Sequence, residues 1–199
     1  PDADPETLAD RTLGERNAAL LRLRQSLFGD ALKSCVECPE CGEALEFELS
    51  ASAFLERAPA AGIGHAMVGD VRVRLPTTRD LASVANEPDE SSAARKLLAR
   101  LCADADCGAA RIPVDDLAGA LDAADPCMDL ALDLSCPACA HQWNSTFDVP
   151  AYLWEELDVR ARRLLDEVHV LAKSYGWSER DILALPETRR YAYLERVLA

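Results

Sequence analysis

The sequence lacks long hydrophobic runs, and this absence limits where the protein can work. No apolar segment approaches the roughly 20 residues that a membrane-spanning helix requires. The first residues also lack the basic stretch followed by an apolar one that marks a secretory signal. We therefore expect no membrane span and a cytoplasmic location.

Cysteine is too scarce for a disulfide scaffold, and positive charge is too scarce for a nucleic-acid-binding protein. Eight cysteines among 199 residues are too few for a disulfide scaffold, and their clustering favours a reducing compartment. The chain carries 21 Lys and Arg against 35 Asp and Glu, and most of the excess negative charge lies in residues 1–150. Because nucleic-acid binding depends on neutralising phosphates with basic side chains, we expect no nucleic-acid partner.

Two short cysteine turns are the strongest motif that is present. They are Cys38-Pro39-Glu40-Cys41 and Cys136-Pro137-Ala138-Cys139. Two residues between the cysteines let both sulfurs of one turn face one metal ion, and two such turns supply the four thiolates of a tetrahedral site. The sequence therefore predicts a structural zinc held by Cys38, Cys41, Cys136 and Cys139.

The remaining cysteines leave alternatives open. Cys35 forms a second CxxC frame with Cys38, but only the Cys38/Cys41 frame carries Pro and Gly where a zinc turn uses them. His141, two residues after Cys139, is an alternative fourth ligand. A redox enzyme using Cys35, Cys38 and Cys41 is a competing hypothesis. The roles of Cys102, Cys107 and Cys127 stay open, although burial as small apolar residues suits Cys102 and Cys127.

Catalytic motifs are absent around this site. The HExxH, P-loop and GxGxxG patterns do not occur, and neither His65 nor His141 begins the H-x-E motif of zinc deaminases. Four protein ligands also leave zinc no open coordination position. We predict a protein that is not an enzyme.

The expected fold is α+β and rich in helix. Residues 1–10 have nothing apolar to bury and are predicted to be disordered. Thr12 and Glu15 form a capping box that introduces a helix over 11–33. A four-cysteine zinc ribbon follows at 34–150, with strands attached to each cysteine turn and an inserted, mainly helical module at about 51–127. Helical periodicity and caps predict a three-helix subdomain at 151–199.

Two local expectations concern the inserted module. His65 falls in a Gly- and Pro-rich stretch and is predicted to lie in a solvated loop. Arg72 and Arg74 alternate with valines in a predicted strand, and we hypothesise that they pair with Glu46 and Glu48 on the strand after the first cysteine turn.

Several separated motifs resemble the baseplate hub assembly chaperones of contractile phage tails, particularly those encoded with extracellular contractile injection systems. The resemblance covers nearly all of residues 20–199 and is most specific at the C-terminal end. It is carried by Leu27-Phe28-Gly29, Cys38-Pro39-Glu40-Cys41-Gly42-Glu43 with Leu45-Glu46-Phe47, Arg74-Leu75-Pro76, Cys136-Pro137-Ala138-Cys139 with His141 and Trp143, Phe147-Asp148, Leu153-Trp154-Glu155, Leu164-Leu165-Asp166-Glu167-Val168-His169, Ala172, Tyr175-Gly176-Trp177-Ser178-Glu179, Asp181-Ile182-Leu183-Ala184-Leu185, Arg189-Arg190 and Tyr193-Leu194.

This resemblance implies a non-enzymatic protein that assembles or joins the baseplate hub, with hub, spike or tube proteins as partners. The family's zinc ligands map onto the same four cysteines. Ala140 departs from the pattern because Gly is usual there, so a positive φ would strain the second turn. Candidate partner contacts are Trp154, His169, Trp177, Arg189 and Arg190, with an aromatic core role as the alternative for the tryptophans. A zinc-ribbon adaptor unrelated to tail machines is the alternative function.

Overall fold

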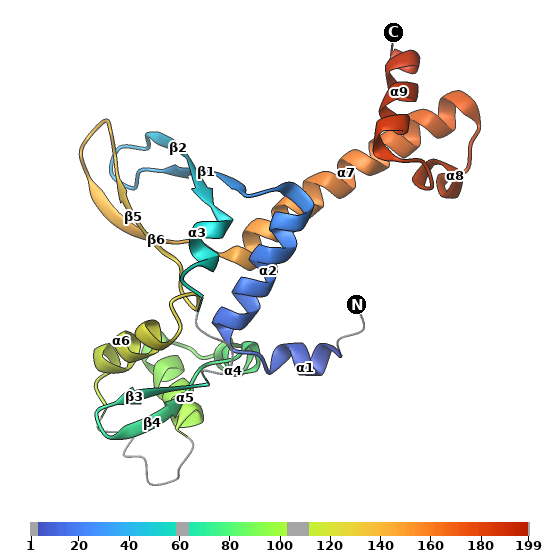
Figure 1. Cartoon of the computed structure of the whole chain (residues 1–199). Helices are drawn as coiled ribbons and strands as arrows, with labels where there is room; N and C mark the ends of the chain where they lie inside the picture. The colour runs from blue at the N-terminus through green and yellow to red at the C-terminus, as the bar shows by residue number, and fades with distance from the viewer. Residues whose placement is uncertain (1–3, 59–63, 103–111, 199) are drawn as a thin grey trace. The chain divides into compact units, whose positions relative to one another are not determined.

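The computed structural model describes residues 4–58, 64–102 and 112–198 (Figure 1). The chain divides into two compact units, Pro1–Pro150 and Ala151–Ala199. The fold mixes helices with three two-stranded antiparallel sheets among the described residues, and helix predominates, as the α+β prediction requires. No helix in these ranges combines the length and the apolar character that crossing a membrane demands.

The N-terminal part departs from the sequence prediction at both ends. Helix α1 spans Pro5–Ala9, so the lead predicted to be disordered holds a short helix capped by Asp4. Helix α2 spans Leu13–Phe28 and begins with the predicted Thr12/Glu15 capping box. The predicted continuation of this helix to residue 33 is wrong. Gly29 ends α2 at a φ of +86°, and strand β1, Ala31–Glu37, follows.

Two β-hairpins carry the cysteine turns. Strand β1 pairs with β2, Ala44–Ser50, and β5, Ala131–Ser135, pairs with β6, Gln142–Thr146. Each hairpin turns at one cysteine pair, so the two metal half-sites lie at the tips of two separate hairpins. Side chains alternate along β2, where Glu46 and Glu48 are exposed and Phe47 is half-buried.

The inserted segment mixes helices and strands, and its part from residue 64 onward packs around a core of its own. It comprises α3, Ala51–Leu55; β3, His65–Val68; β4, Val71–Arg74; α4, Thr78–Val84; α5, Glu90–Leu101; and α6, Val114–Ala124. The core cluster is formed by Ala66, Val73, Leu75, Leu98, Leu101, Leu117 and Leu121. His65 lies in β3, not in a loop, because β3 pairs with β4 in a tight hairpin.

Asp80 is the polar centre of this module. It is 1% exposed and accepts hydrogen bonds from Arg74 at 2.5 Å and from Arg100 Nε at 3.0 Å. The backbone N–H of Thr77 also donates to it, at 3.0 Å. The hypothesis that Arg72 and Arg74 pair with Glu46 and Glu48 is therefore wrong, since β4 pairs with β3 and not with β2. Arg72 instead contacts His65 Nδ1 at 3.0 Å.

Helix α2 is attached to the end of α6 by buried polar contacts. The backbone N–H of Gly14 donates to Asp125 Oδ2 at 2.9 Å, and Asn17 Nδ2 donates to the Cys127 carbonyl at 2.9 Å. Asp125 is fully buried. Since Gly14 lies in the first turn of α2, this carboxylate also complements the positive end of the helix dipole. These contacts join residues more than 100 positions apart in the sequence.

The C-terminal unit is built on one long helix. Helix α7 spans Val149–Tyr175, and α8, Glu179–Leu183, and α9, Glu187–Leu198, follow it (Figure 1). Gly176, at a φ of +69°, donates its N–H to the Ala172 carbonyl at 2.9 Å and ends α7. The core consists of the buried side chains of Leu171, Ile182 and Leu194. The chain thus folds back on itself twice within this unit.

Candidate metal centre

The first cysteine turn places two sulfurs at the tip of the β1–β2 hairpin. The backbone N–H of Cys38 donates to the Glu43 carbonyl at 2.8 Å, and that of Gly42 donates to the Cys38 carbonyl at 2.9 Å. Gly42 has a φ of +74°, a value that costs little only for glycine. The turn therefore depends on Gly directly after the second cysteine.

The second turn repeats this geometry almost atom for atom. Cys136 N–H donates to the His141 carbonyl at 2.8 Å, and Ala140 N–H donates to the Cys136 carbonyl at 2.9 Å. Ala140 has a φ of +60° and is the one residue other than glycine with positive φ in the described ranges. The strain predicted at Ala140 from the sequence is confirmed. Its cost is about 1 kcal/mol.

The two turns bring their four sulfurs together. The Sγ atoms of Cys38 and Cys139 are 3.7 Å apart, and those of Cys41 and Cys136 are 3.6 Å apart. All four lie within 4.8 Å of one another. A disulfide would need about 2.05 Å, whereas four sulfurs held about 2.3 Å from a central zinc ion would be about 3.8 Å apart. The spacing fits a metal-bound tetrahedron of thiolates.

Backbone N–H groups and neighbouring sulfurs perturb the thiols in opposite directions. The backbone N–H of Cys139 is the main group that lowers the pKa of Cys136, to about 7. The backbone N–H of Glu43 lowers the pKa of Cys41, but the thiols of Cys139 and Cys136 outweigh it and raise that pKa to about 12. The close approach of the four sulfurs therefore makes it unfavourable for several of them to be deprotonated at once. A bound cation removes that opposition, so metal binding and thiol deprotonation are coupled.

The other predicted metal ligands stay outside the cluster. Cys35 is exposed on β1, opposite Glu46. The ring of His141 stacks on Trp143 with centroids 5.8 Å apart. The backbone carbonyl of His141 accepts the N–H of Cys136 within the turn. Within the part of the chain that the structure describes, the group of side chains placed to hold a metal ion consists of the four cysteines alone.

The remaining cysteines have separate positions. Cys127 is buried, and its Sγ donates to the Phe54 carbonyl at 3.4 Å. Burial raises the pKa of this thiol, which keeps it protonated and unreactive. Cys102 is half-buried just after α5. Cys107 lies outside the described residues. The expected burial as small apolar residues thus holds for Cys127.

The backbone donors are the functional feature that sequence reasoning missed. The N–H groups of Glu43, Cys139 and His141 act on the thiols of Cys41, Cys136 and Cys139, respectively. Such donors stabilise thiolates. Their positions follow from the turn conformation, so the only signal for them in the sequence is the CPxC turn itself.

The predicted partner residues divide into exposed and internal ones. Trp154, His169 and Arg189 are exposed. Trp177 is half-buried, stacks on Tyr175 with ring centroids 4.8 Å apart and contacts Tyr193 edge-on. Arg190 has a side chain only 12% exposed, and its Nε lies 3.0 Å from Glu167 Oε2. The predicted surface role of Arg190 is wrong, because its guanidinium holds α9 against α7.

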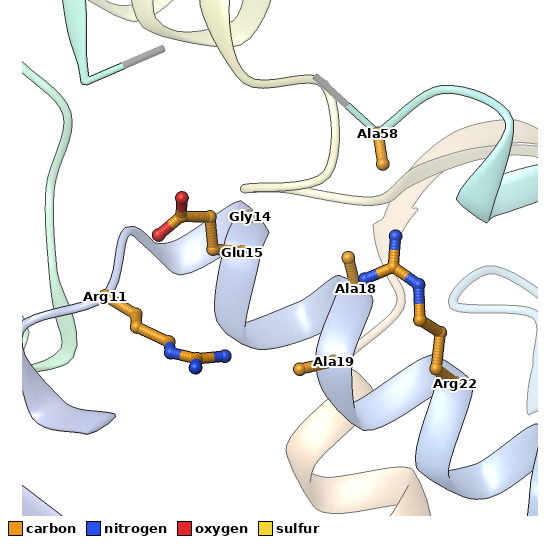
Figure 2. Close-up of a pocket in the computed structure, with 7 residues that line it drawn as sticks. All are labelled: Arg11, Gly14, Glu15, Ala18, Ala19, Arg22 and Ala58. Atoms are coloured by element: carbon orange, nitrogen blue, oxygen red, sulfur yellow. The ribbon is translucent and has the colours of Figure 1, made fainter. Parts of the chain in front are cut away.

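A pocket of about 410 Å³ lies beside α2. Figure 2 shows Arg11, Glu15 and Arg22 around it, with small alanine side chains between them. The Glu15 carboxylate is engaged in the capping box, where it accepts the N–H of Thr12 at 3.3 Å. Ala58 forms one wall of the pocket. The four-cysteine cluster is the candidate functional site, because its side chains are placed to hold a metal ion.

Comparison with protein-family models, with curated proteins and with solved structures gives no match for this chain. Its class is accordingly defined by the fold and the cluster: a mixed α/β protein with four cysteines placed to bind a metal ion.

Proposed function

We propose that this protein is a non-enzymatic assembly chaperone or hub component of the baseplate of a contractile injection system, and that it contains one structural zinc ion. The proposal combines the family resemblance with one structural observation. Two hairpins each contribute two thiols to a single cluster. The neighbouring sulfurs, Cys38 with Cys139 and Cys41 with Cys136, belong to residues 101 and 95 positions apart in the sequence.

Zinc is the metal that this donor set favours. Four thiolates in tetrahedral arrangement select zinc or an iron–sulfur cluster, and CPxC turns with Gly after the second cysteine are typical of zinc ribbons. The ion joins the two hairpins and closes the 94-residue segment between Cys41 and Cys136. Structural zinc contributes on the order of 10 kcal/mol of apparent binding free energy, so it stabilises the platform on which the inserted module is built.

The C-terminal unit supplies the partner contact in this proposal. Its net charge is close to zero, whereas residues 1–150 are strongly acidic. Exposed His169 and Arg189 offer polar contacts to a partner, and arginine is favoured in protein interfaces. The partners are hub, spike or tube proteins of the same particle, which is assembled in the cytoplasm.

The acidic first unit has a different role. Glu37, Glu40, Glu43, Glu46 and Glu48 are all exposed around the first hairpin. Their repulsion of phosphates disfavours nucleic acid as a partner. These carboxylates instead keep the zinc-bound part solvated while the C-terminal unit binds.

Two other functions make different predictions. A zinc-ribbon adaptor outside any tail machine would share the metal site, and its gene would lie away from tube, sheath and spike genes. A redox protein would use Cys35 with Cys38 and Cys41 as free thiols. Zinc bound tightly by one chain excludes the redox function, because Cys38 and Cys41 are then metal ligands.

Co-expression with the hub, spike and tube proteins encoded beside it tests the proposed function. The full chain is expected to capture one of them in a pull-down, and a chain lacking residues 151–199 is expected to lose the capture. Zinc content near one per chain in both forms would show that the metal-bound unit stays folded. Unchanged capture by the shortened chain would contradict the assigned role of the C-terminal unit.

A further inference from the structure

Helix α7 carries the most exposed large apolar side chains among the described residues. Trp154 is 72% exposed, Val159 67% and Leu165 62%. Trp154 and Leu165 are eleven residues apart, which on an α-helix returns to nearly the same direction after about three turns. These two side chains therefore mark one line along the helix, whereas Val159 points well away from it.

This line follows coiled-coil spacing. Trp154, Asp158, Ala161 and Leu165 succeed one another at steps of four, three and four residues, which is the seam of a heptad pattern. The same steps continue to Val168 and Ala172, which pack against the core of the C-terminal unit. This seam is covered by the unit itself at Val168 and Ala172. It is uncovered between residues 154 and 165, where Trp154, Ala161 and Leu165 are apolar and Asp158 is charged.

We propose that a second copy of this chain covers the seam, with the two α7 helices antiparallel across a two-fold axis between residues 159 and 160. In this register Trp154 packs against Leu165 of the second copy, and Ala161 lies opposite Asp158. The seam is self-complementary because its large residues stand at the two ends and the small Ala161 near the middle. Such isologous contacts are the usual basis of homodimers.

Charge complementarity supports the antiparallel direction. Asp158 is paired with Arg162 within the helix at 2.8 Å, and the Arg162 side chain is 77% exposed. Across the two-fold axis, Arg162 of one copy lies beside exposed Glu155 of the other, which forms two equivalent ion pairs at the flank. A parallel, in-register pair would instead place the two Asp158 carboxylates in one layer, where they repel each other.

The covered stretch is only about three turns long, so the dimer is expected to be weak and concentration-dependent. Glu155 and Arg162 give it a specific signature. Reversing one of these charges creates repulsion twice, once at each end of the two-fold pair. Reversing both charges in one chain exchanges the positive and negative positions, so the attraction between the two copies is restored.

Sedimentation of the full, zinc-loaded chain over about 1 to 200 μM at low salt tests the proposal. The unmodified chain is expected to shift from monomer to dimer with concentration. Glu155→Arg or Arg162→Glu is expected to weaken association about tenfold, and the double variant to restore it to within about threefold. Trp154→Ala is expected to abolish it. Glu195→Arg, at an exposed position of α9, is the matched charge control and is expected to leave the association unchanged.

Three outcomes would overturn the proposal: a chain that is monomeric throughout this range, a dimer that Trp154→Ala leaves unchanged, or a double charge reversal that fails to rescue. Circular dichroism and zinc content confirm that each variant is folded. A monomeric chain that captures a hub protein through Trp154 would also reject the dimer, while leaving the proposed assembly function intact.

Discussion

Ala140 occupies in the second cysteine turn the same left-handed backbone position that Gly42 occupies in the first. The φ angles are +60° and +74°, and each N–H donates at 2.9 Å to the carbonyl of the first cysteine of its turn. The two halves of the metal site therefore have one geometry but unequal strain, since only Ala140 has a Cβ atom.

Replacing Ala140 with Gly is expected to stabilise the protein by up to about 1 kcal/mol, because it relieves the Cβ clash of the left-handed conformation. Ala140 is exposed, so the change removes little packing. Denaturant unfolding of the zinc-loaded chain measures the difference. Gly42→Ala is the matched control and should destabilise by about the same amount. Equal stability of all three forms would show that the turns relax without strain.

Removal of a single thiol from the cluster is expected to release the metal. Cys136→Ser and Cys41→Ser should each lower zinc content from one per chain to well below one, measured by elemental analysis. Cys35→Ser is the control and should keep the zinc, because Cys35 is outside the cluster. Zinc loss from the Cys35 variant would revive the alternative CxxC frame.

Zinc binding is expected to release protons and to weaken as the pH falls. The pKa of Cys41 in the metal-free cluster is about 12, raised by Cys139 and Cys136 against the lowering effect of the Glu43 N–H. This thiol is therefore protonated at pH 7 and must lose its proton to bind. Competition with a chromophoric chelator between pH 6 and 8 measures the effect. An affinity independent of pH would contradict thiolate ligation.

Asp80→Asn is expected to destabilise the inserted module by about 3 kcal/mol, because it leaves Arg74 and Arg100 without their buried carboxylate. The hydrogen bond from Arg74 holds the pKa of the Asp80 carboxyl well below its usual range. A lowered pKa gives stability that is full above pH about 4 and is lost as the pH falls further. Thermal unfolding between pH 3 and 7 should show this loss in the unmodified chain and a flatter profile in Asp80→Asn. Parallel profiles would contradict this assignment.

Gly14→Ala is expected to destabilise the protein, although alanine favours an ordinary helix by about 1 kcal/mol. A Cβ at position 14 would collide with the Asp125 carboxylate, which accepts the Gly14 N–H. Gly119→Ala, in α6, is the matched control, because a Cβ there meets no atom within 4 Å. Denaturant unfolding of the three forms gives the comparison. A stabilised Gly14→Ala chain would show that Asp125 moves aside at little cost.

Much of the architecture follows from local patterns. The Thr12/Glu15 capping box and the strands attached to the cysteine turns agree with the sequence. Each depends on residues close in the chain, where caps and periodicity act directly. The predicted end of α2 was wrong because Ala31 and Leu32 also fit the apolar face of a helix. Only their pairing with Ser50 and Leu49 makes them a strand.

The sequence by itself predicted which four cysteines come together, because two residues between the cysteines let both sulfurs of one turn face the same point. It also marked Ala140 as the strained position. Tertiary structure decided what surrounds the side chains that the pattern left ambiguous. Arg190 lies inside the C-terminal unit and forms an ion pair with Glu167, and Arg74 forms an ion pair with Asp80. Their neighbours come from other elements, and no periodicity along one segment encodes which long-range partner a charged side chain will meet. Trp154 and Leu165 likewise stay exposed only because the C-terminal unit covers this line of α7 further along, at Val168 and Ala172.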